Sequence, residues 1–421
     1  MRSNIDSLEM AEQGLFSDLD SPSPLPSSVS SSDSQKKYIL TNPDYAHQIL
    51  KSSQRFCPVP TVVRRPYDPE QYTRISCISD THGKHRQVCV PQCDILLHGG
   101  DFTQTGEHRL VEDVGDYFGQ LLRGEDTHSR VNAVMQNNES DGPASPSRNG
   151  AVGEIICIAG NHDITFQPET YATNYKTFHP RGPLDTNVTR SLLTHCTYLQ
   201  DESYVSNGIQ FYGSPWSPEF GQHWAFNQSR LEIHRQWDLI PAGTDVLITH
   251  GPPIGRGDFC HSGVRAGCVN LLHQVQTRIL PRIHLFGHIH ESYGVTSDGT
   301  TLFVNASSCT LNYNVDNPCI VIDLPHDKSV PAVVVKPQCT LSGEEVVAVL
   351  KSMCKRHVAY CDLIPLFEEA TPLVEGRDLV LDDLVIDEIA CLRLEMHRQK
   401  NWFALKLALR GFIMDLRARS Y

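Results

Sequence analysis

The chain has 421 residues, of which 40% are hydrophobic, so it is long enough to bury a sizeable core. Its formal net charge of −13 argues against a nucleic-acid-binding surface, because such surfaces bind phosphates through an excess of basic residues. The sequence contains neither a basic start followed by an apolar run nor an apolar stretch of about 18 residues. We therefore expect no signal peptide and no transmembrane segment, and a location in the cytoplasm or the nucleus. The 14 cysteines form no CxxC pair, which favours reduced, buried thiols.

The first segment of the chain, residues 1–65, is expected to be a disordered tail. Ser and Pro dominate residues 17–36, and such a composition buries too little apolar surface to offset the entropy of ordering. A second polar stretch, rich in Asn, Ser, Pro and Gly, spans residues 135–152 and predicts a surface insertion. Between these segments and residue 335 we expect one core domain, residues 66–335.

Short runs of β-branched and apolar residues recur along this domain and predict strands. Several runs are apolar throughout, which is typical of strands that are buried on both faces. Helical patterns lie between some of them, around residues 111–122 and 268–280. We therefore predict an α/β fold in which two packed mixed β-sheets are flanked by helices. The predicted strands are residues 74–79, 94–98, 154–159, 208–213, 245–249, 282–286, 300–305 and 318–323.

Side chains that can bind metal ions follow five of these strands. Because the loops at the carboxyl ends of strands in open α/β sheets converge, residues that are distant in sequence can meet there. A glycine stands beside the polar residues at four of the five ends, where it permits sharp turns and the close approach of a ligand. In chain order these polar residues are Asp80, His82, Asp101, Asn161, His162, Asp163, His250, His288 and His290.

Each motif has an ordinary structural explanation when it is taken alone. Asp80 would cap a turn, and the polar residues 161–163 would bond to the backbone of a local turn. The histidines at 288 and 290 would point to opposite faces of a strand. Five such motifs in this order, each at the end of a strand, favour a shared metal centre instead.

Two divalent ions suit the hydrolysis of a phosphate ester. They neutralise the phosphoryl oxygens, lower the pKa of a water, and hold both attacking and leaving groups when they lie about 3.5–4 Å apart. Asp101 has two carboxylate oxygens and would bridge the ions, while imidazoles and an amide oxygen supply neutral ligands. One ion would then be held by Asp80, His82 and His290, and the other by Asn161, His250 and His288.

The five motifs resemble the signature blocks of the calcineurin-like metallophosphoesterase superfamily. Residues 213–216, 249–253, 284–294 and 305–309 resemble its metallophosphoesterase domain-containing branch, which includes brain-type members. The resemblance covers roughly residues 70–325. It implies a four-layer sandwich, the seven metal ligands named above with Asp101 as the bridge, and two divalent ions that are Mn, Fe or Zn.

The resemblance also implies that His162 gives a proton to the leaving alkoxide. An imidazole suits this role because it titrates near neutral pH, and Asp163 would orient it. The alternative is a histidine that is merely hydrogen-bonded in a turn. The expected activity is hydrolysis of phosphodiesters or phosphomonoesters, cyclic nucleotides included, by a hydroxide that bridges the two ions. The competing hypothesis is a weakly active scaffold protein that binds a nucleotide or metal.

Further side chains near the motifs leave two interpretations open. Rings downstream of residue 213 would either stack on a nucleobase or belong to the core, and two arginines after His250 would either bind a second phosphate or be solvated. These residues are Trp216, Phe220, His223 and Trp224, and the arginines are Arg256 and Arg265.

Residues 336–421 predict a helical extension. A capping box begins at Ser342, and a helical pattern follows to about residue 360. An acidic stretch, residues 361–390, precedes a basic amphipathic stretch, residues 393–419. The two stretches either pair with each other and pack on the domain, or offer a surface to a protein partner or a membrane.

Overall fold

The computed structural model of the chain describes residues 32–63, 67–125, 152–336, 339–342 and 378–381. Clustering of contacts divides the chain into two units, of which the first, ending at Val334, holds both large sheets. The second unit contains strand β1 (Thr61–Val63) and an antiparallel pair, β16 (Cys339–Ser342) and β17 (Asp378–Leu381).

The first sheet carries three of the five predicted motifs. Within the first unit its strands run in the order β15-β14-β2-β3-β4-β5, with only Val333 and Val334 of β15 belonging to that unit. Strands β2 to β5 are parallel, and β14 pairs antiparallel with β2. The strands are β2 (Tyr72–Ile78), β3 (Cys93–His98), β4 (Val152–Cys157), β5 (Thr197–Tyr198), β14 (Ile320–Pro325) and β15 (Val333–Lys336).

The second sheet carries the other two motifs. Its order is β12-β13-β11-β10-β7-β6, with four parallel central strands and one antiparallel strand at each edge. Two further two-residue strands, β8 (Ser217–Pro218) and β9 (Asn227–Gln228), pair with each other. The six strands of the sheet are β6 (Glu202–Ser206), β7 (Ile209–Ser214), β10 (Val246–Thr249), β11 (Ile283–Phe286), β12 (Gly294–Ser297) and β13 (Leu302–Asn305).

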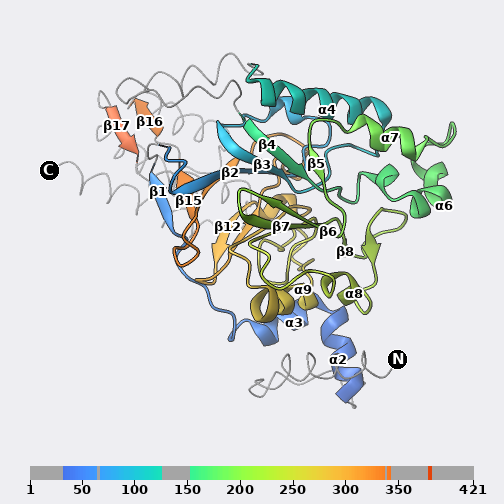
Figure 1. Cartoon of the computed structure of the whole chain (residues 1–421). Helices are drawn as coiled ribbons and strands as arrows, with labels where there is room; N and C mark the ends of the chain where they lie inside the picture. Colours follow the sequence, from blue (N-terminus) through green and yellow to red (C-terminus); the bar gives the residue numbers. More distant parts are fainter. Residues whose placement is uncertain (1–31, 64–66, 126–151, 337–338, 343–377, 382–421) are drawn as a thin grey trace, which may run out of the picture. The chain divides into compact units, whose positions relative to one another are not determined.

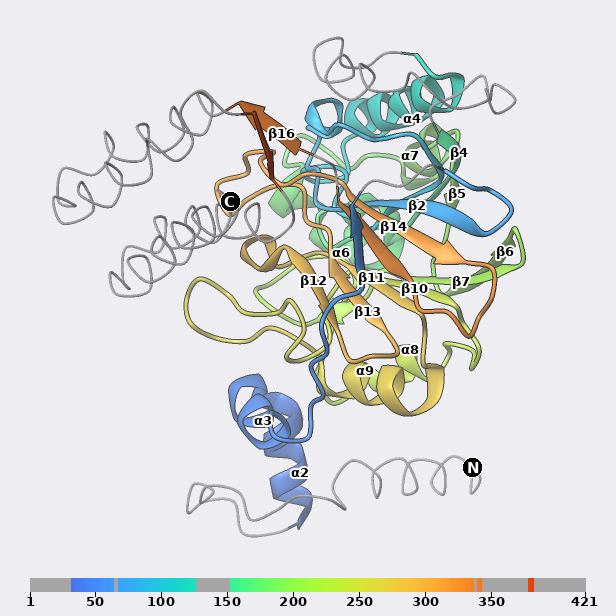
Figure 2. The same ribbon diagram turned by 90° about the vertical axis from the view of Figure 1, so that its left-hand side faces the viewer.

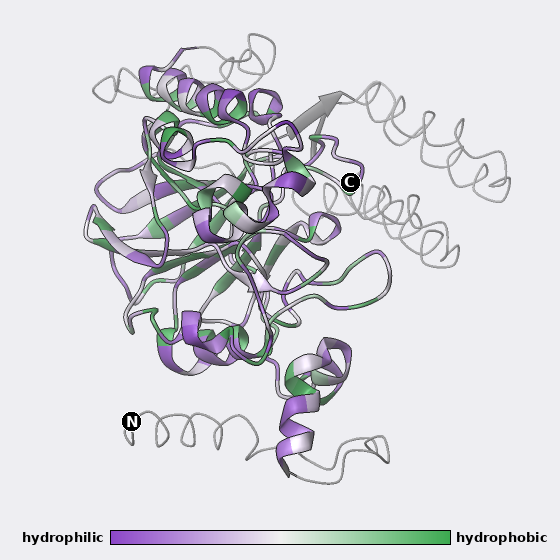
Figure 3. Cartoon of the chain, turned by 90° about the vertical axis from the view of Figure 1, so that its right-hand side faces the viewer, coloured by the Kyte–Doolittle hydropathy of each residue, from purple (hydrophilic) through white to green (hydrophobic). Residues whose placement is uncertain are grey.

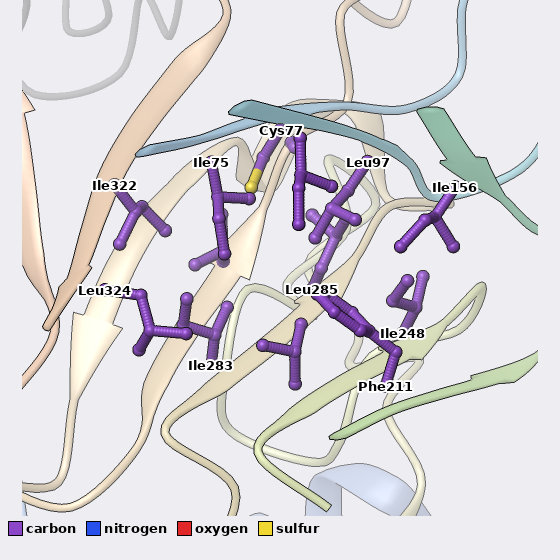
Figure 4. Packing of buried hydrophobic residues seen from close by; sticks show 14 of the residues in the cluster. Ile75, Cys77, Leu97, Ile156, Phe211, Ile248, Ile283, Leu285, Ile322 and Leu324 are labelled. Atoms are coloured by element: carbon purple, nitrogen blue, oxygen red, sulfur yellow. The ribbon is translucent and has the colours of Figure 1, made fainter. Parts of the chain in front are cut away.

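The core lies between the two sheets. Figure 4 shows hydrophobic side chains of β2, β3 and β4 facing those of β7, β10 and β11. Alternate residues of each strand point into this layer, which is the two-residue period of a strand. Ile75 and Leu97 from one sheet and Ile248 and Leu285 from the other are fully buried there.

Helices cover the outer face of each sheet (Figure 1). The amphipathic helix α4 buries Val111, Val114 and Phe118 against the first sheet and ends at Gly124, whose φ of 68° closes the helix in the left-handed conformation. Its turns alternate between hydrophobic and hydrophilic residues in Figure 3, at the top of the view. The helices on this face are α4 (His108–Arg123), α6 (Pro168–Phe178) and α7 (Thr186–Leu192), with short 3-10 turns η1 (His85–Gln87) and η2 (Ile164–Phe166).

The outer face of the second sheet is covered by α8 (His234–Trp237) and α9 (Val269–Gln274), and α9 continues as the π-helix η3 (Val275–Ile279). Trp237, Leu271 and Val275 pack there against Leu247 and Phe303 of the sheet. A further 3-10 turn, η4 (His290–Ser292), follows β11. The predicted four-layer α/β fold is thereby confirmed, and the helix predicted over residues 268–280 changes to π geometry at residue 275.

Two helices precede the first sheet in a segment that the sequence predicts to be disordered. They are α2 (Ser32–Thr41) and α3 (Pro43–Leu50), seen at the lower left of Figure 2. Asn42 caps α3 by accepting a hydrogen bond from the backbone of Tyr45 at 3.0 Å. Ile39 and Ala46 are buried in the same apolar cluster as Trp237. The prediction of disorder is therefore wrong for residues 32–50, because apolar residues outside the Ser/Pro stretch anchor the helices to the second sheet's outer layer.

The remaining predictions concern the strands, the insertion, the C-terminal extension and transmembrane segments. All eight predicted strands are confirmed, with ends shifted by up to two residues. The predicted insertion, residues 135–152, lies outside the described residues except for Val152, which begins β4. Ser342 ends strand β16, and the helical pattern predicted to follow it, to about residue 360, lies outside the described residues. Within the helical extension predicted for residues 336–421, the described residues 339–342 and 378–381 form the strands β16 and β17 instead. Among the residues described, no helix combines the length and the apolar character that crossing a bilayer requires.

Candidate metal centre

The seven predicted ligands come together at the carboxyl ends of strands from both sheets. Strands β2, β3 and β4 contribute one half of the site, and β10 and β11 contribute the other half. The convergence predicted from the sequence is therefore observed. Three groups of residues place one potential ligand atom each within 4.8 Å of one another: Asp80, His82 and His290; His82, Asp101 and His162; and Asp101, His250 and His288.

The first group gathers around the carboxylate of Asp80. The Nε2 atom of His290 lies 3.4 Å from Asp80 Oδ1 and 3.1 Å from the Nε2 atom of His82. Asp80 Oδ2 accepts a hydrogen bond from the hydroxyl of Ser307 at 2.9 Å, which fixes the orientation of the carboxylate. Two imidazole nitrogens and a carboxylate oxygen thus face one point, as three ligands of one divalent ion would.

The second group gathers around His250. Its Nε2 atom lies 3.3 Å from Asp101 Oδ2 and 2.9 Å from the amide oxygen of Asn161. The ring of His288 lies 5.0 Å from the ring of His250. The backbone N–H of His288 also donates to both oxygens of Asp80 at 3.0 Å, so this residue connects the two groups.

Asp101 lies between the two groups. Its Oδ2 atom is 3.3 Å from His250 Nε2 and 3.9 Å from His82 Nε2. Its Oδ1 atom accepts a hydrogen bond from the backbone N–H of His162 at 2.7 Å. One carboxylate oxygen therefore faces ligand atoms of both groups, while the other is held by the loop that follows β4.

The backbone at the site is strained. Four of the seven residues have positive φ angles, in the left-handed region that side chains with a Cβ atom rarely adopt. Such conformations cost free energy and are retained where function requires them. The four φ angles are 52° for Asp80, 46° for His82, 54° for Asp101 and 68° for His288.

Two glycines are required by the close approach of the ligands. A Cβ atom added to Gly287 would lie 1.9 Å from Asp80 Oδ2, and one added to Gly160 would lie 2.3 Å from Asp101 Oδ1. Both contacts are far shorter than any van der Waals separation. These two positions therefore admit only glycine while the carboxylates stay in place.

The charges at the site favour bound cations. Burial opposes ionisation of Asp80 and Asp101, but nearby histidines outweigh it and hold the pKa of both carboxyls below the usual value. Burial lowers the pKa of His82 to about 4 and that of His288 to about 3, so both imidazoles are neutral and can bind a metal. Burial also opposes charging of His250, yet the neighbouring Asp101 raises the pKa of His250 to about 9.

Unpaired polar atoms support the same conclusion. The Nδ2 atom of Asn161 and the Nδ1 atom of His82 are buried and have no hydrogen-bond partner within the described residues. Leaving such atoms unpaired is costly unless their side chains serve another purpose. Two buried carboxylates, neutral imidazoles and an amide oxygen form a donor set that fits divalent ions such as Mn, Fe or Zn.

Backbone carbonyls orient two of the imidazoles. His290 donates from Nδ1 to the carbonyl of Thr310 at 3.1 Å, and His250 donates from Nδ1 to the carbonyl of Gly99 at 2.9 Å. A neutral imidazole that donates from Nδ1 carries its lone pair on Nε2. Both Nε2 atoms face the carboxylates, so these rings are arranged as metal-binding histidines generally are.

His98 is a positioning residue that the sequence analysis did not identify. It ends β3 immediately before the Gly-Gly-Asp motif and is fully buried. Its Nδ1 atom accepts the backbone N–H of Gly100 at 3.2 Å, and its Nε2 atom lies 3.1 Å from the hydroxyl of Thr81. One ring thus joins the loop that carries Asp80 to the loop that carries Asp101.

His162 and Asp163 take different positions from each other. The Nδ1 atom of His162 lies 2.8 Å from the carbonyl of Gln104, which orients the ring. Asp163 is buried and accepts hydrogen bonds from the backbone of Thr103 and Gly160, both at 2.9 Å. The predicted orienting role of Asp163 is therefore wrong, because its carboxylate is committed to the backbone of two loops. Gln104 supplies that contact instead.

The other side chains singled out in the sequence have separate roles. The ring of Phe220 lies 4.7 Å from His288, and that of Trp224 lies 4.2 Å from His162, so both border the site. Trp216 packs on Phe226 and donates to Asp201 at 2.8 Å, which makes it part of the core framework. His223 contacts Asn174, Arg265 pairs with Asp258 at 2.6 Å, and Arg256 is buried between the rings of Phe56 and Phe303.

Both arginines are thus occupied by protein groups. The guanidinium of Arg256 lies 3.9 Å from the centre of one ring and 4.7 Å from the other. This arrangement is a cation–π contact on both faces. Neither of the two alternatives left open by the sequence, binding a second phosphate or being solvated, holds for Arg256, whose side chain is fully buried in the protein.

Comparisons with known proteins agree with this site. Residues 73–292 match the family model for "Calcineurin-like phosphoesterase". The human "Metallophosphoesterase domain-containing protein 1" is 41% identical over 300 residues, which cover 68% of this chain and 83% of that protein. A UPF0046 protein of Caenorhabditis elegans is 35% identical over 262 residues, which cover 61% of this chain and 82% of that protein.

Among solved structures, one from a study titled "Structural and Functional Characterization of a Novel Archaeal Phosphodiesterase" is 14% identical. It covers 62% of this chain and 99% of its own, with a TM-score of 0.26, which is too low to carry an argument. The family model and the similarity to the human protein confirm the predicted family. The chain belongs to the calcineurin-like phosphoesterase family.

Proposed function

We propose that the protein is a dinuclear metal-dependent phosphoesterase that hydrolyses phosphodiesters or phosphomonoesters. The observation that carries this proposal is the position of Asp101, whose Oδ2 atom faces His250 on one side and His82 on the other. A single carboxylate between two groups of imidazoles is suited to hold two cations next to each other. Membership of the phosphoesterase family supports the same reaction.

Each of the two ions would be bound by its own group of residues, and Asp101 would bind both. Asp80, His82 and His290 would hold one of them, and Asn161, His250 and His288 would hold the other, with Asp101 common to both. When bound, the two ions neutralise the phosphoryl group and lower the pKa of a water at the site. Mn, Fe and Zn all suit this mixture of carboxylate and imidazole ligands.

His162 is the proposed proton donor to the leaving oxygen. Because its Nδ1 atom faces the carbonyl of Gln104, the proton that it gives up is the one on Nε2. The ring is partly exposed and packs on Trp224, so it borders the cluster without being enclosed in it. A leaving alkoxide that receives this proton departs as a neutral alcohol, which lowers the barrier to its departure.

The proposal is tested by metal removal and by one matched pair of variants. The purified full-length chain is dialysed against a chelator, reloaded with Mn²⁺ or Zn²⁺, and assayed with bis-p-nitrophenyl phosphate. We expect no turnover without metal and recovery on reloading. Asp101→Asn should lower kcat/KM by on the order of 10³-fold, which corresponds to about 4 kcal/mol of transition-state stabilisation.

Asp113→Asn serves as the control, because Asp113 pairs with Arg86 on the surface at 2.8 Å and lies outside the metal groups. It should keep wild-type turnover. The competing proposal, a scaffold that binds metal or nucleotide, predicts stoichiometric metal uptake in elemental analysis together with negligible turnover for every ester tested. That result would replace the enzyme proposal.

A further inference from the structure

Tyr313 has a backbone conformation that its side chain disfavours. Its φ of 58° lies in the left-handed region, which Gly and Asn adopt far more readily than a bulky aromatic residue. Retained strain of this kind concentrates at functional sites, where surrounding contacts hold the residue in place. The backbone therefore gives no reason for a tyrosine at this position.

The surrounding contacts are those of a tight loop, residues 309–315. Cys309 and Val315 form an antiparallel bridge at its base, and the backbone N–H of Thr310 donates to the carbonyl of Asn314 at 2.8 Å. The ammonium group of Lys84 donates to the carbonyl of Tyr313 from outside the loop. The same loop orients His290 through the carbonyl of Thr310, so the position of Tyr313 is fixed relative to the metal centre.

The ring of Tyr313 borders three histidines of the site. Its centre lies 4.8 Å from the ring of His82, 5.4 Å from that of His290 and 6.4 Å from that of His162. The residue is nevertheless 36% exposed and belongs to none of the buried apolar clusters of the described residues. Packing of the core therefore does not account for this ring either.

We propose that Tyr313 is a specificity-determining residue whose ring packs against a planar ring of the substrate. The substrate class is then a phosphate ester that carries an aryl or heteroaromatic group near its phosphoryl group. Ring pairs gain affinity beyond the area that they bury, whereas an alkyl group in the same place would gain only the buried area. This inference rests on the proposed function, because it uses the metal centre to fix the phosphoryl group.

The inference is tested by binding rather than by turnover. Phenylphosphonate and methylphosphonate each offer the same anion to the metals, and only the first carries a ring. We measure the affinity of the Mn²⁺-loaded full chain for both by calorimetry. In the wild type phenylphosphonate should bind more tightly, and Tyr313→Asn should weaken its binding by about 3- to 10-fold while methylphosphonate binding stays constant.

Two variants separate specificity from a structural role. Tyr313→Phe keeps the ring and should keep the preference for phenylphosphonate. Leu280→Asn is the matched control, since Leu280 has a φ of 51° and is 49% exposed at the end of the π-helix. Both Asn variants relieve the same backbone strain, so their melting temperatures should equal or exceed that of the wild type. Only Tyr313→Asn should change the affinity ratio.

The outcomes for the two proposals are distinct. If Tyr313→Asn leaves the ratio of the two affinities unchanged while the wild type hydrolyses esters, the inference about Tyr313 is wrong and the enzyme proposal stands. If the wild type turns over no ester but keeps a ring preference that Tyr313→Asn removes, the enzyme proposal is wrong, and Tyr313 contributes to ligand binding rather than to substrate specificity.

Discussion

Two buried regions of this protein are built in opposite ways. The layer between the sheets contains fully buried aliphatic side chains, such as Ile75 and Leu285, on strands with ordinary backbone geometry. The loops at the carboxyl ends of the same strands bury Asp80 and Asp101, and both of these have a strained backbone. Burial is therefore similar in the two regions, and only the chemistry and the backbone strain distinguish them.

The difference shows how the free energy of folding is distributed. Burying aliphatic side chains stabilises the fold by roughly 25 cal/mol for each Å² of apolar surface removed from water. Burying carboxylates and holding residues in the left-handed region both oppose folding. The apolar layer thus offsets the cost of the loops above it. Substitutions in one region should affect stability, and those in the other should affect metal binding and turnover.

Among substitutions of residues that are not themselves proposed ligands, the largest effect is expected at Gly287, where the loops permit no side chain. Gly287→Ala would place a methyl group 1.9 Å from Asp80 Oδ2 and 2.2 Å from the hydroxyl of Ser79, so the carboxylate must move. We expect kcat/KM to fall by more than about 100-fold and the bound metal to fall with it. Elemental analysis and a steady-state assay measure both quantities.

The control for Gly287 is Gly243→Ala. Unlike Gly287, Gly243 has a positive φ, 84°, but an added Cβ atom would meet nothing within 4 Å. This variant should lose about 1 kcal/mol of stability through backbone strain and keep its metal. Equal losses of activity in the two variants would show that displacement of the Asp80 carboxylate is not responsible.

The next largest effect is expected in the layer between the sheets. Ile322 lies on β14, which carries none of the proposed ligands, and its side chain is fully buried. Ile322→Ala should lower the free energy of unfolding by roughly 2–5 kcal/mol, because it removes buried methyl groups and leaves a cavity. Urea denaturation measures this loss. At temperatures where the variant stays folded, kcat should be unchanged. A large fall in kcat would show that the apolar layer and the loops with the proposed ligands do not have separate effects on stability and turnover.

A smaller effect, dependent on pH, is expected at His284 on β11. The hydroxyl of Thr249 donates to the carbonyl of Gly251, so it accepts a hydrogen bond from His284 Nε2, 2.9 Å away. The Nδ1 atom is then unprotonated, and it is buried without a partner within the described residues. Burial lowers the pKa of this histidine to about 3. Charging it in the folded state would place an unpaired cation in the interior.

The sign of the pH effect follows from this shift. The pKa of the folded state lies below the unfolded value of about 6.5, so the unfolded state binds the proton first as the pH falls. The stabilisation from His284 is complete above pH 6.5 and is lost towards pH 3. Between pH 7 and pH 5 the wild type should lose about 2 kcal/mol more stability than His284→Gln, which keeps a donor for Thr249 and does not titrate. Denaturant titrations at both pH values would contradict this expectation if the two losses were equal.

The sequence predicts the central strands well because their apolar runs are long and clearly bounded. Edge strands are harder to predict from the sequence. Strand β6 was not predicted as a separate strand, because residues along it such as Val205 are exposed. Helices α2 and α3 were missed because the nearby Ser/Pro stretch dominates the composition, while only a few apolar residues anchor them. Local patterns do not report which distant surface a residue will contact.

The site likewise contains residues that local sequence patterns predict and residues whose roles depend on the assembled fold. The metal-binding groups could be predicted because each stands in a recognisable motif at the end of a predicted strand. Gln104 and Tyr313 stand in no such motif, and their roles depend on a carbonyl direction and a φ angle that arise from the assembled loops. His98 could have been predicted from the sequence, since it directly precedes the Gly-Gly-Asp motif. Asp163 was misassigned because proximity in sequence to His162 does not fix the direction of its side chain.

The origin of the ligands from both sheets has a thermodynamic consequence. Residues after β2, β3 and β4 belong to one sheet, and those after β10 and β11 belong to the other. Cations held between them would act as cross-links, binding only when the two sheets are docked. Any free energy of metal binding is then added to the free energy of sheet docking. Metal occupancy would report on the integrity of the whole sandwich, and a chelator would act as a mild denaturant.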